Sequence, residues 1–218
     1  MKESGSRFLY QGGIGEIEEK KSRFIAELSC ASSEEEASAF IASKKKQFYD
    51  ARHNCHAYVI GKGAEIRHCS DDGEPGGTAG RPMLEVLLAE GLTDVVAVVT
   101  RYFGGTLLGT GGLIRAYQGA VKEALTQCII GERIPGFELS ASFAYTELGK
   151  IQHILSDLDV PILDTLYTDS VSLKALVRSE QKDALTRKLT DATSGNAVLS
   201  FSDPTEFLFA DGKITGKC

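Results

Sequence analysis

Apolar and polar positions in the first part of the chain predict an antiparallel sheet interrupted by helices. Residues 22–29 mix apolar and polar side chains as a strand does, and an edge strand is expected around 14–18. Residues 54–60 and 65–70 form a strand pair in this reading, joined by a glycine-containing turn. The continuous apolar run at 95–100 predicts a strand buried in the core.

Helical signals separate these strands. Ser32 with Glu35, or Ser33 with Glu36, has the spacing of a capping box and predicts a helix start. A short helix is expected from about residue 82 to 90, with a proline in its first turn. A longer helix is expected over 112–128, with one apolar stripe formed by Leu113, Tyr117, Ala120, Ala124 and Cys128.

The order of predicted strands and helices changes near residues 131–136, where glycine and proline suggest a domain boundary. We expect one domain over 1–134 and a second over 135–218. The second has the order strand, helix, strand, strand, helix, strand, which matches a ferredoxin-like unit. Its expected elements are strands at 137–144, 161–167, 171–178, 197–201 and 206–210, and helices at 146–158 and 179–193, the latter capped by Ser179.

A glycine-rich segment, Arg101–Tyr117, follows the apolar strand directly and leads into the long helix. Its glycines are Gly104, Gly105, Gly109, Gly111 and Gly112. Glycine there indicates positive φ angles or close approach of another group. The start of a helix also offers free N–H groups and the positive end of its dipole, which suit an anion such as an RNA phosphate. Arg101 and Arg115 bracket the loop and could bind the same anion.

Two familiar phosphate motifs do not fit this segment. The dinucleotide fingerprint needs glycine or alanine where Ile114 stands, and no Lys-Ser or Lys-Thr follows the glycines as in a P-loop. A tight turn that lets the helix pack closely on its sheet is the alternative to an anion site.

Three carboxylates, Asp71, Asp72 and Glu74, lie together in a second glycine-rich loop. They could hold Mg²⁺ or supply a general acid and base. Pairing with Arg81, Arg101 and Arg115 is the reading that we rank first, metal binding the second and acid–base catalysis the third.

Thiol and imidazole groups at His53, Cys55, His56, His68 and Cys69 raise the question of zinc. On a strand, however, His53 and Cys55 face one side and His56 the other. We therefore expect Cys55 and Cys69 to be small buried residues, and we predict no metal site and no cofactor. A Cys55–His nucleophilic pair has no visible orienting partner.

Composition narrows the class of protein. A net charge of −6 argues against coating nucleic acid by bulk charge but allows a local basic site. Five scattered cysteines without a CxxC pattern favour a reducing cytoplasm. The first five residues lack the apolar core of a signal peptide, and no segment is apolar over a membrane-spanning length, so we expect a cytoplasmic protein without a membrane partner.

Three motifs, Arg52–Tyr58, Asp71–Leu84 and Val99–Tyr117, closely resemble the IMPACT/YigZ family. The match spans about residues 20–128, and the remainder is similar to the small C-terminal domain of bacterial members. The resemblance implies an α+β fold. Its first domain would be like the second domain of a small-subunit ribosomal protein, a sheet with helices on one side. Its second would be like the ferredoxin-like last domain of elongation factor G.

The resemblance also implies a role in translation, because eukaryotic relatives regulate translation initiation. It supplies no catalytic residues. We therefore predict a non-catalytic protein in translation or its regulation that binds RNA, the ribosome or a protein partner. The residues expected to bind the anion are Arg81, Arg101, Arg115 and the five glycines, with the acidic loop ordering Arg81 and Arg101. The alternative is a metal-assisted phosphate-ester hydrolase or transferase.

Overall fold

The computed structural model describes residues 6–217, with side chains described as far as residue 216. Contacts divide the chain into an N-terminal unit, Met1–Glu132 with Ala210–Lys213, and a C-terminal unit, Arg133–Phe209 with Ile214–Cys218. The expectations for residues 1–5 and Cys218 lie outside the described residues. Within that described range, no helix has the length and hydropathy that a membrane crossing requires.

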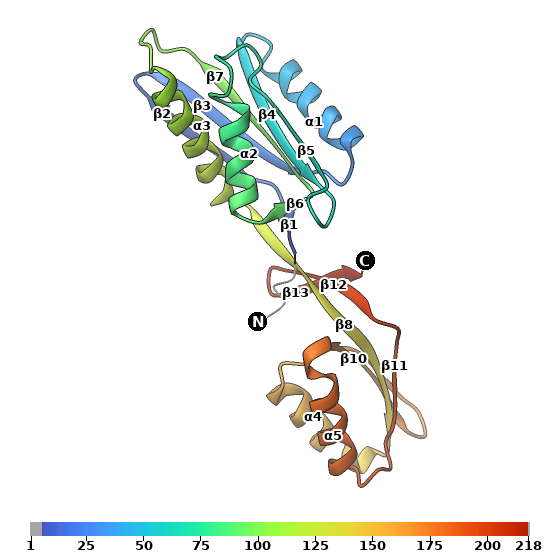
Figure 1. The fold of residues 1–218 in the computed structure, drawn as a ribbon. Coiled ribbons are helices and arrows are strands. Elements are labelled where there is room, and N and C mark those ends of the chain that lie inside the picture. The colour runs from blue at the N-terminus through green and yellow to red at the C-terminus, as the bar shows by residue number, and fades with distance from the viewer. Residues whose placement is uncertain (1–5, 218) are drawn as a thin grey trace. The chain divides into compact units, whose positions relative to one another are not determined.

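A five-stranded antiparallel sheet forms the centre of the N-terminal unit (Figure 1). Its spatial order is β2-β3-β7-β4-β5. The strands are β2 (Ile14–Glu19), β3 (Ser22–Cys30), β4 (His53–Ile60), β5 (Ile66–Ser70) and β7 (Val95–Tyr102). The expected strands at 14–18, 22–29, 54–60, 65–70 and 95–100 are all present within a residue or two of these bounds.

Helices cover both faces of this sheet (Figure 1). α2 (Gly80–Ala89) and α3 (Thr110–Leu125) pack on one face, where Ala97 and Val99 of β7 join the main core cluster. α1 (Glu34–Gln47) packs on the other face, where Val96 joins a smaller cluster with Ala37. The expectation of helices on one side only is therefore wrong. A strand covered on both faces reads as a continuous apolar run, as β7 does.

The predicted capping chemistry of α1 is present. Ser33 is the N-cap, and its hydroxyl oxygen accepts the backbone N–H of Glu36 at 3.2 Å. The Glu36 carboxylate in turn accepts the backbone N–H and the hydroxyl of Ser32. The Ser33 hydroxyl satisfies one first-turn donor, and the Glu36 carboxylate holds Ser32, the residue before the N-cap.

The C-terminal unit has the predicted ferredoxin-like arrangement. Its sheet order is β11-β8-β10-β9, all antiparallel, which is the 4-1-3-2 order of a split βαβ unit. α4 and α5 supply the helical layer, and their buried leucines and isoleucine join the core below the sheet. The elements are β8 (Ile129–Phe143), α4 (Leu148–Asp157), β9 (Ile162–Tyr167), β10 (Val171–Arg178), α5 (Lys182–Ala192) and β11 (Val198–Phe201), followed by β12 (Thr205–Ala210) and β13 (Lys213–Lys217).

The contacts divide the chain between Glu132 and Arg133, within the expected boundary region 131–136, but β8 runs without interruption through that region. Its residues 129–132 pair with β1 (Arg7–Gln11), and from Gly136 onward it pairs with β10. Pro135 stands between these two ladders, where its missing N–H costs neither of them a hydrogen bond. The division between the units therefore falls within a strand.

Two further details differ from the sequence-based expectation. β1, which also pairs in parallel with β6 (Leu92–Thr93), is not among the expected strands. Ser179 does not cap α5; it begins a short 3₁₀ turn, and α5 has no side-chain cap.

Candidate anion-binding cavity

The glycines of the Arg101–Tyr117 segment are required for different reasons. A Cβ on Gly104 would lie 2.1 Å from the carbonyl carbon of Lys21, so the backbone of the β2–β3 turn requires glycine there. Gly105 and Gly109 have φ angles of +86° and +73°, which side chains rarely adopt. A Cβ on Gly112 would meet the Leu108 side chain at 2.9 Å. At Gly111 φ is not positive and a Cβ would meet nothing within 4 Å.

The N-terminus of α3 is open to a ligand. Gly109 is the N-cap residue, and no side chain within the described part of the chain caps the helix. The Gly109 carbonyl accepts the first helical bond, from the Leu113 N–H at 3.0 Å. The amides of Thr110, Gly111 and Gly112 are thus the free donors of the first turn. The Gly104 amide is already used, since it donates to the Ser22 hydroxyl at 3.1 Å.

A cavity of about 740 Å³ lies beside this helix end. Residues from three regions of the chain line it: 50–53, 73–75, and 101–103 with 107–110 and Leu113. Phe103 and Leu107 on its wall are 54% and 81% exposed, which is unusual for large apolar side chains. The cavity therefore combines apolar walls, a helix N-terminus and charged side chains.

A buried ion pair lies against this cavity. Arg101 at the end of β7 donates from Nη1 to Glu74 Oε1 at 2.6 Å, and the two side chains are 7% and 3% exposed. The Tyr117 hydroxyl of α3 donates to the same oxygen at 2.9 Å, and the Cys55 thiol of β4 donates to that hydroxyl at 3.3 Å. This network joins the acidic loop, two strands and α3.

Arg101 is not fully satisfied by these contacts. Its guanidinium lies over the rings of Phe24 and Phe103, at 5.4 and 5.5 Å from their centroids. Within the described residues, its buried Nε has no hydrogen-bond partner. A buried N–H without an acceptor is costly, and this atom is itself closed off from solvent, so the cost falls on the fold.

Asp71 organises the acidic loop from within. One carboxylate oxygen accepts the backbone N–H groups of Ala79 and Gly80, both at 2.9 Å, and the other accepts that of Gly77 at 2.8 Å. Burial alone would raise the pKa of Asp71, but the three amide donors outweigh it and lower the pKa. Asp71 thus fixes the loop against the start of α2.

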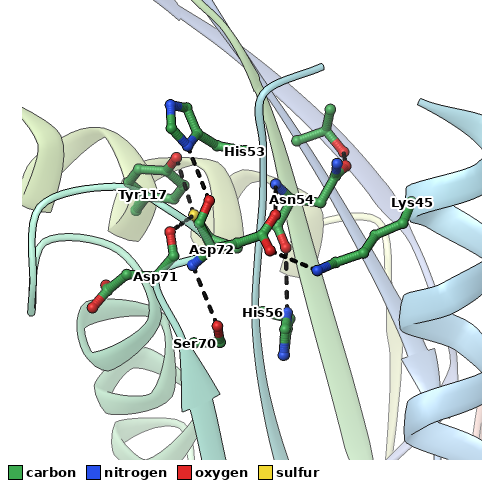
Figure 2. Close-up of polar contacts among 10 residues, drawn as sticks. Lys45, His53, Asn54, His56, Ser70, Asp71, Asp72 and Tyr117 are labelled. Carbon is green, nitrogen blue, oxygen red and sulfur yellow. Dashed lines mark hydrogen bonds and ion pairs between the residues drawn. The ribbon is translucent and has the colours of Figure 1, made fainter. Parts of the chain in front are cut away.

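Asp72 links the same loop to two elements of the sheet layer. Figure 2 shows Lys45 of α1 and Asn54 of β4 meeting its carboxylate, which accepts from Lys45 Nζ at 2.6 Å and from the Asn54 N–H at 2.8 Å. Burial opposes ionisation here, but the lysine and the amide prevail and lower the pKa of Asp72.

The carboxylates of the acidic loop are all engaged, but of the expected arginine partners only Arg101 pairs with the loop among the described residues. Asp71 and Asp72 accept from backbone amides and Lys45, and Glu74 accepts from Arg101. Arg81 does not pair with this loop as expected; it lies on the exposed side of α2 and binds Glu85 at 3.1 Å. Arg115 is exposed on α3 and close in sequence to its open N-terminus.

The histidines and cysteines of β4 do not converge. Cys55 is fully buried in the core below α2 and α3, and burial raises its pKa to about 12. His56 stacks on His68 at 5.8 Å between ring centroids, and its Nδ1 donates to the Asn54 carbonyl oxygen at 3.2 Å. His53 lines the cavity, with Nδ1 at 3.0 Å from the Asp72 carbonyl oxygen. A thiol that remains protonated at neutral pH is a poor nucleophile.

Acid should destabilise the protein through Asp71. Because its pKa is lower in the folded state than its ordinary 3.8, its stabilising contribution is present above pH 3.8 and is lost as the pH falls further. Asp71→Asn should lower the free energy of unfolding at pH 7 by about 1–3 kcal/mol, because the amide NH₂ would face a backbone donor.

Urea unfolding of both proteins between pH 7 and pH 3 measures this difference. The gap between wild type and Asp71→Asn should narrow below pH 4, while Glu85→Gln on the exposed face of α2 should match wild type at pH 7. A gap that stays constant down to pH 3 would contradict the role given to Asp71.

Comparisons with known proteins place the fold in a family. Residues 20–125 match the model of the Impact N-terminal domain, and residues 142–196 match a domain of unknown function, DUF1949. The chain is 45% identical to the IMPACT family member YvyE of Bacillus subtilis over 195 residues, covering 89% of this chain and 90% of the relative. The chain belongs to the IMPACT family.

Other relatives agree with this membership of the IMPACT family. YigZ of Escherichia coli is 40% identical over 184 residues, covering 84% of this chain and 90% of that protein. A crystal structure titled as that of a hypothetical protein is 37% identical and has a TM-score of 0.58, covering 90% of this chain and 96% of the other. The cavity of this IMPACT family protein lies within the part matched by the Impact N-terminal domain.

Sequence reasoning missed part of the cavity. Phe103 and Leu107 were read only as members of the glycine-rich segment, and Arg52 only as part of a motif, yet all three line the cavity. The sequence did contain a signal for Phe103 and Leu107. They are large apolar residues in a glycine-rich loop, outside the apolar patterns of the flanking strand and helix, which indicates an exposed apolar surface. Glu74 and Tyr117 could not be paired from sequence, because they are 43 residues apart.

Proposed function

We propose that this protein is a non-catalytic cytoplasmic protein of translation or its regulation, which binds RNA or the ribosome through its N-terminal unit. The observation that carries the proposal is the uncapped N-terminus of α3 with Arg115 exposed on the same helix. Backbone amides at a helix start and a guanidinium are the groups that bind phosphate in proteins. The translational part of the proposal comes from the resemblance of the motifs to a family whose eukaryotic members regulate initiation.

Charge sets the strength expected of such binding. The chain carries a net −6, so long-range attraction to RNA is weak and binding depends on a few local contacts. Arg101 contributes little free charge to this surface, because Glu74 neutralises it at 2.6 Å. We therefore assign the exposed phosphate contact to Arg115 and the α3 amides.

Co-sedimentation with ribosomes across a salt series tests this function. Arg115→Ala should weaken binding at every salt concentration and reduce the slope of log affinity against log salt by about one. Arg187→Ala is the matched control, since it removes the same charge from an exposed position on α5.

Equal losses for the two variants would contradict the assignment to Arg115, and absence of ribosome and RNA binding by the wild type would contradict the function. Mg²⁺-dependent turnover of a phosphate ester would instead support the hydrolase or transferase alternative. The engaged carboxylates of the acidic loop do not favour that alternative.

A further inference from the structure

We propose that the cavity beside α3 binds one nucleoside phosphate unit, with the base against Phe103 and the phosphate at the start of the helix. If the nucleoside phosphate is part of an RNA chain, this inference rests on the proposed function. It then specifies that the cavity binds an unpaired nucleotide of that RNA. A free nucleotide has the same chemistry, so it is the second possible source of the ligand.

The size and walls of the cavity suit this ligand. Its volume of about 740 Å³ lies within the range of roughly 300–1,000 Å³ that is typical of small-molecule sites. Leucines 107, 108 and 113 give it an apolar side, while Arg52 and His53 give it a polar one. Inorganic phosphate would make no use of an apolar wall. A nucleotide would, because its base has an apolar face that can pack against these side chains.

Phe103 is the expected contact for the base. It follows the buried strand β7 directly, yet its side chain is 54% exposed and lines the cavity. The guanidinium of Arg101 lies 5.5 Å from its ring centroid and helps to hold the ring in place. Proteins that bind single-stranded nucleic acid commonly stack bases on such aromatic side chains.

Two features mark the anionic part of the cavity. The first is the N-terminus of α3, a helix of 16 residues whose cap supplies no side-chain acceptor. The second is Arg101, which is more than nine-tenths buried, lines the same cavity and has an Nε without a partner among the described residues. An anion at the helix start would use the free amides, with the Arg101 side chain, whose charge Glu74 already offsets, beside it in the cavity wall.

Binding of short ligands to the full chain tests this inference. The probes are a single-stranded RNA hexamer, the same sugar–phosphate hexamer without bases, adenosine 5′-monophosphate and inorganic phosphate. Affinity for the hexamers is measured by fluorescence anisotropy, and binding of the small ligands by thermal protection without Mg²⁺. Phe103→Leu removes the ring and keeps an apolar side chain. Tyr167→Leu is its control, an aromatic of equal exposure at 55% on the ferredoxin-like unit.

We expect Phe103→Leu to weaken the RNA hexamer and adenosine 5′-monophosphate about tenfold, because base stacking is lost, and to leave inorganic phosphate unchanged. Tyr167→Leu should leave the binding of all four ligands unchanged.

If hexamer affinity depends neither on the bases nor on Phe103, the inference is overturned and the proposed RNA-binding function stays intact. Phe103-dependent binding of the mononucleotide without any RNA binding would support the cavity and overturn the RNA function. No protection by any nucleotide and no hexamer binding would overturn both.

Discussion

Glu74→Ala is expected to lower the free energy of unfolding by about 3–5 kcal/mol, the largest effect of any single change discussed for this protein. The carboxylate is 3% exposed and accepts from Arg101 at 2.6 Å and from the Tyr117 hydroxyl at 2.9 Å. Its removal leaves the Arg101 guanidinium, which is 7% exposed, without the carboxylate that balances its charge. Urea unfolding followed by circular dichroism measures the loss.

A double variant separates the charge from the packing. Glu74→Ala combined with Arg101→Leu removes both charges, so it should be more stable than Glu74→Ala alone. Arg81→Ala, which breaks an exposed ion pair with Glu85, should change stability by less than about 1 kcal/mol. A double variant less stable than Glu74→Ala would show that the cost does not come from the unpaired charge.

Gly104→Ala should destabilise the fold by about 3 kcal/mol, the second largest effect that we expect. The new Cβ would meet the Lys21 carbonyl carbon at 2.1 Å, so the β2–β3 turn or the loop must shift. That shift also disturbs the bond from the Gly104 N–H to the buried Ser22 hydroxyl. Thermal unfolding of the variant measures the effect.

Gly111→Ala is the matched control for this change. It lies in the same segment, but a Cβ there meets nothing within 4 Å and the position is helical. Alanine should therefore be neutral or stabilise by about 0.4–1 kcal/mol. If the two variants are equally destabilised, the close approach at Gly104 is not the reason for its glycine.

Local signals were sufficient for much of the fold. Alternation and apolar runs located the strands of the N-terminal sheet, and the Ser33–Glu36 spacing located the start of α1. The order of elements was sufficient for the ferredoxin-like unit, because that order allows few sheet arrangements. The local sequence pattern did not show that α1 packs on the opposite face of the sheet. The resemblance to a ribosomal protein domain with helices on one side predicted this packing wrongly.

Misleading local signals explain the other differences. Pro135 and Gly136 lie close to the division between the units, as expected, yet β8 continues through them while its partner changes from β1 to β10. At the site, the glycine cluster indicated the right region but not the separate reasons for Gly104, Gly109 and Gly111. Tyr117 was predicted as part of the apolar stripe of α3, and its ring is buried there; its hydroxyl contact with Glu74 depends on tertiary structure.

The most direct measurement of the central claim, an open anion site at the start of α3, is a titration of the ¹⁵N-labelled protein with a 5′-phosphorylated RNA trinucleotide, followed by amide chemical shifts. We expect saturable shifts of the Thr110, Gly111 and Gly112 amides, together with that of Phe103. Saturable shifts confined to other parts of the chain, with these four amides unmoved, would contradict it.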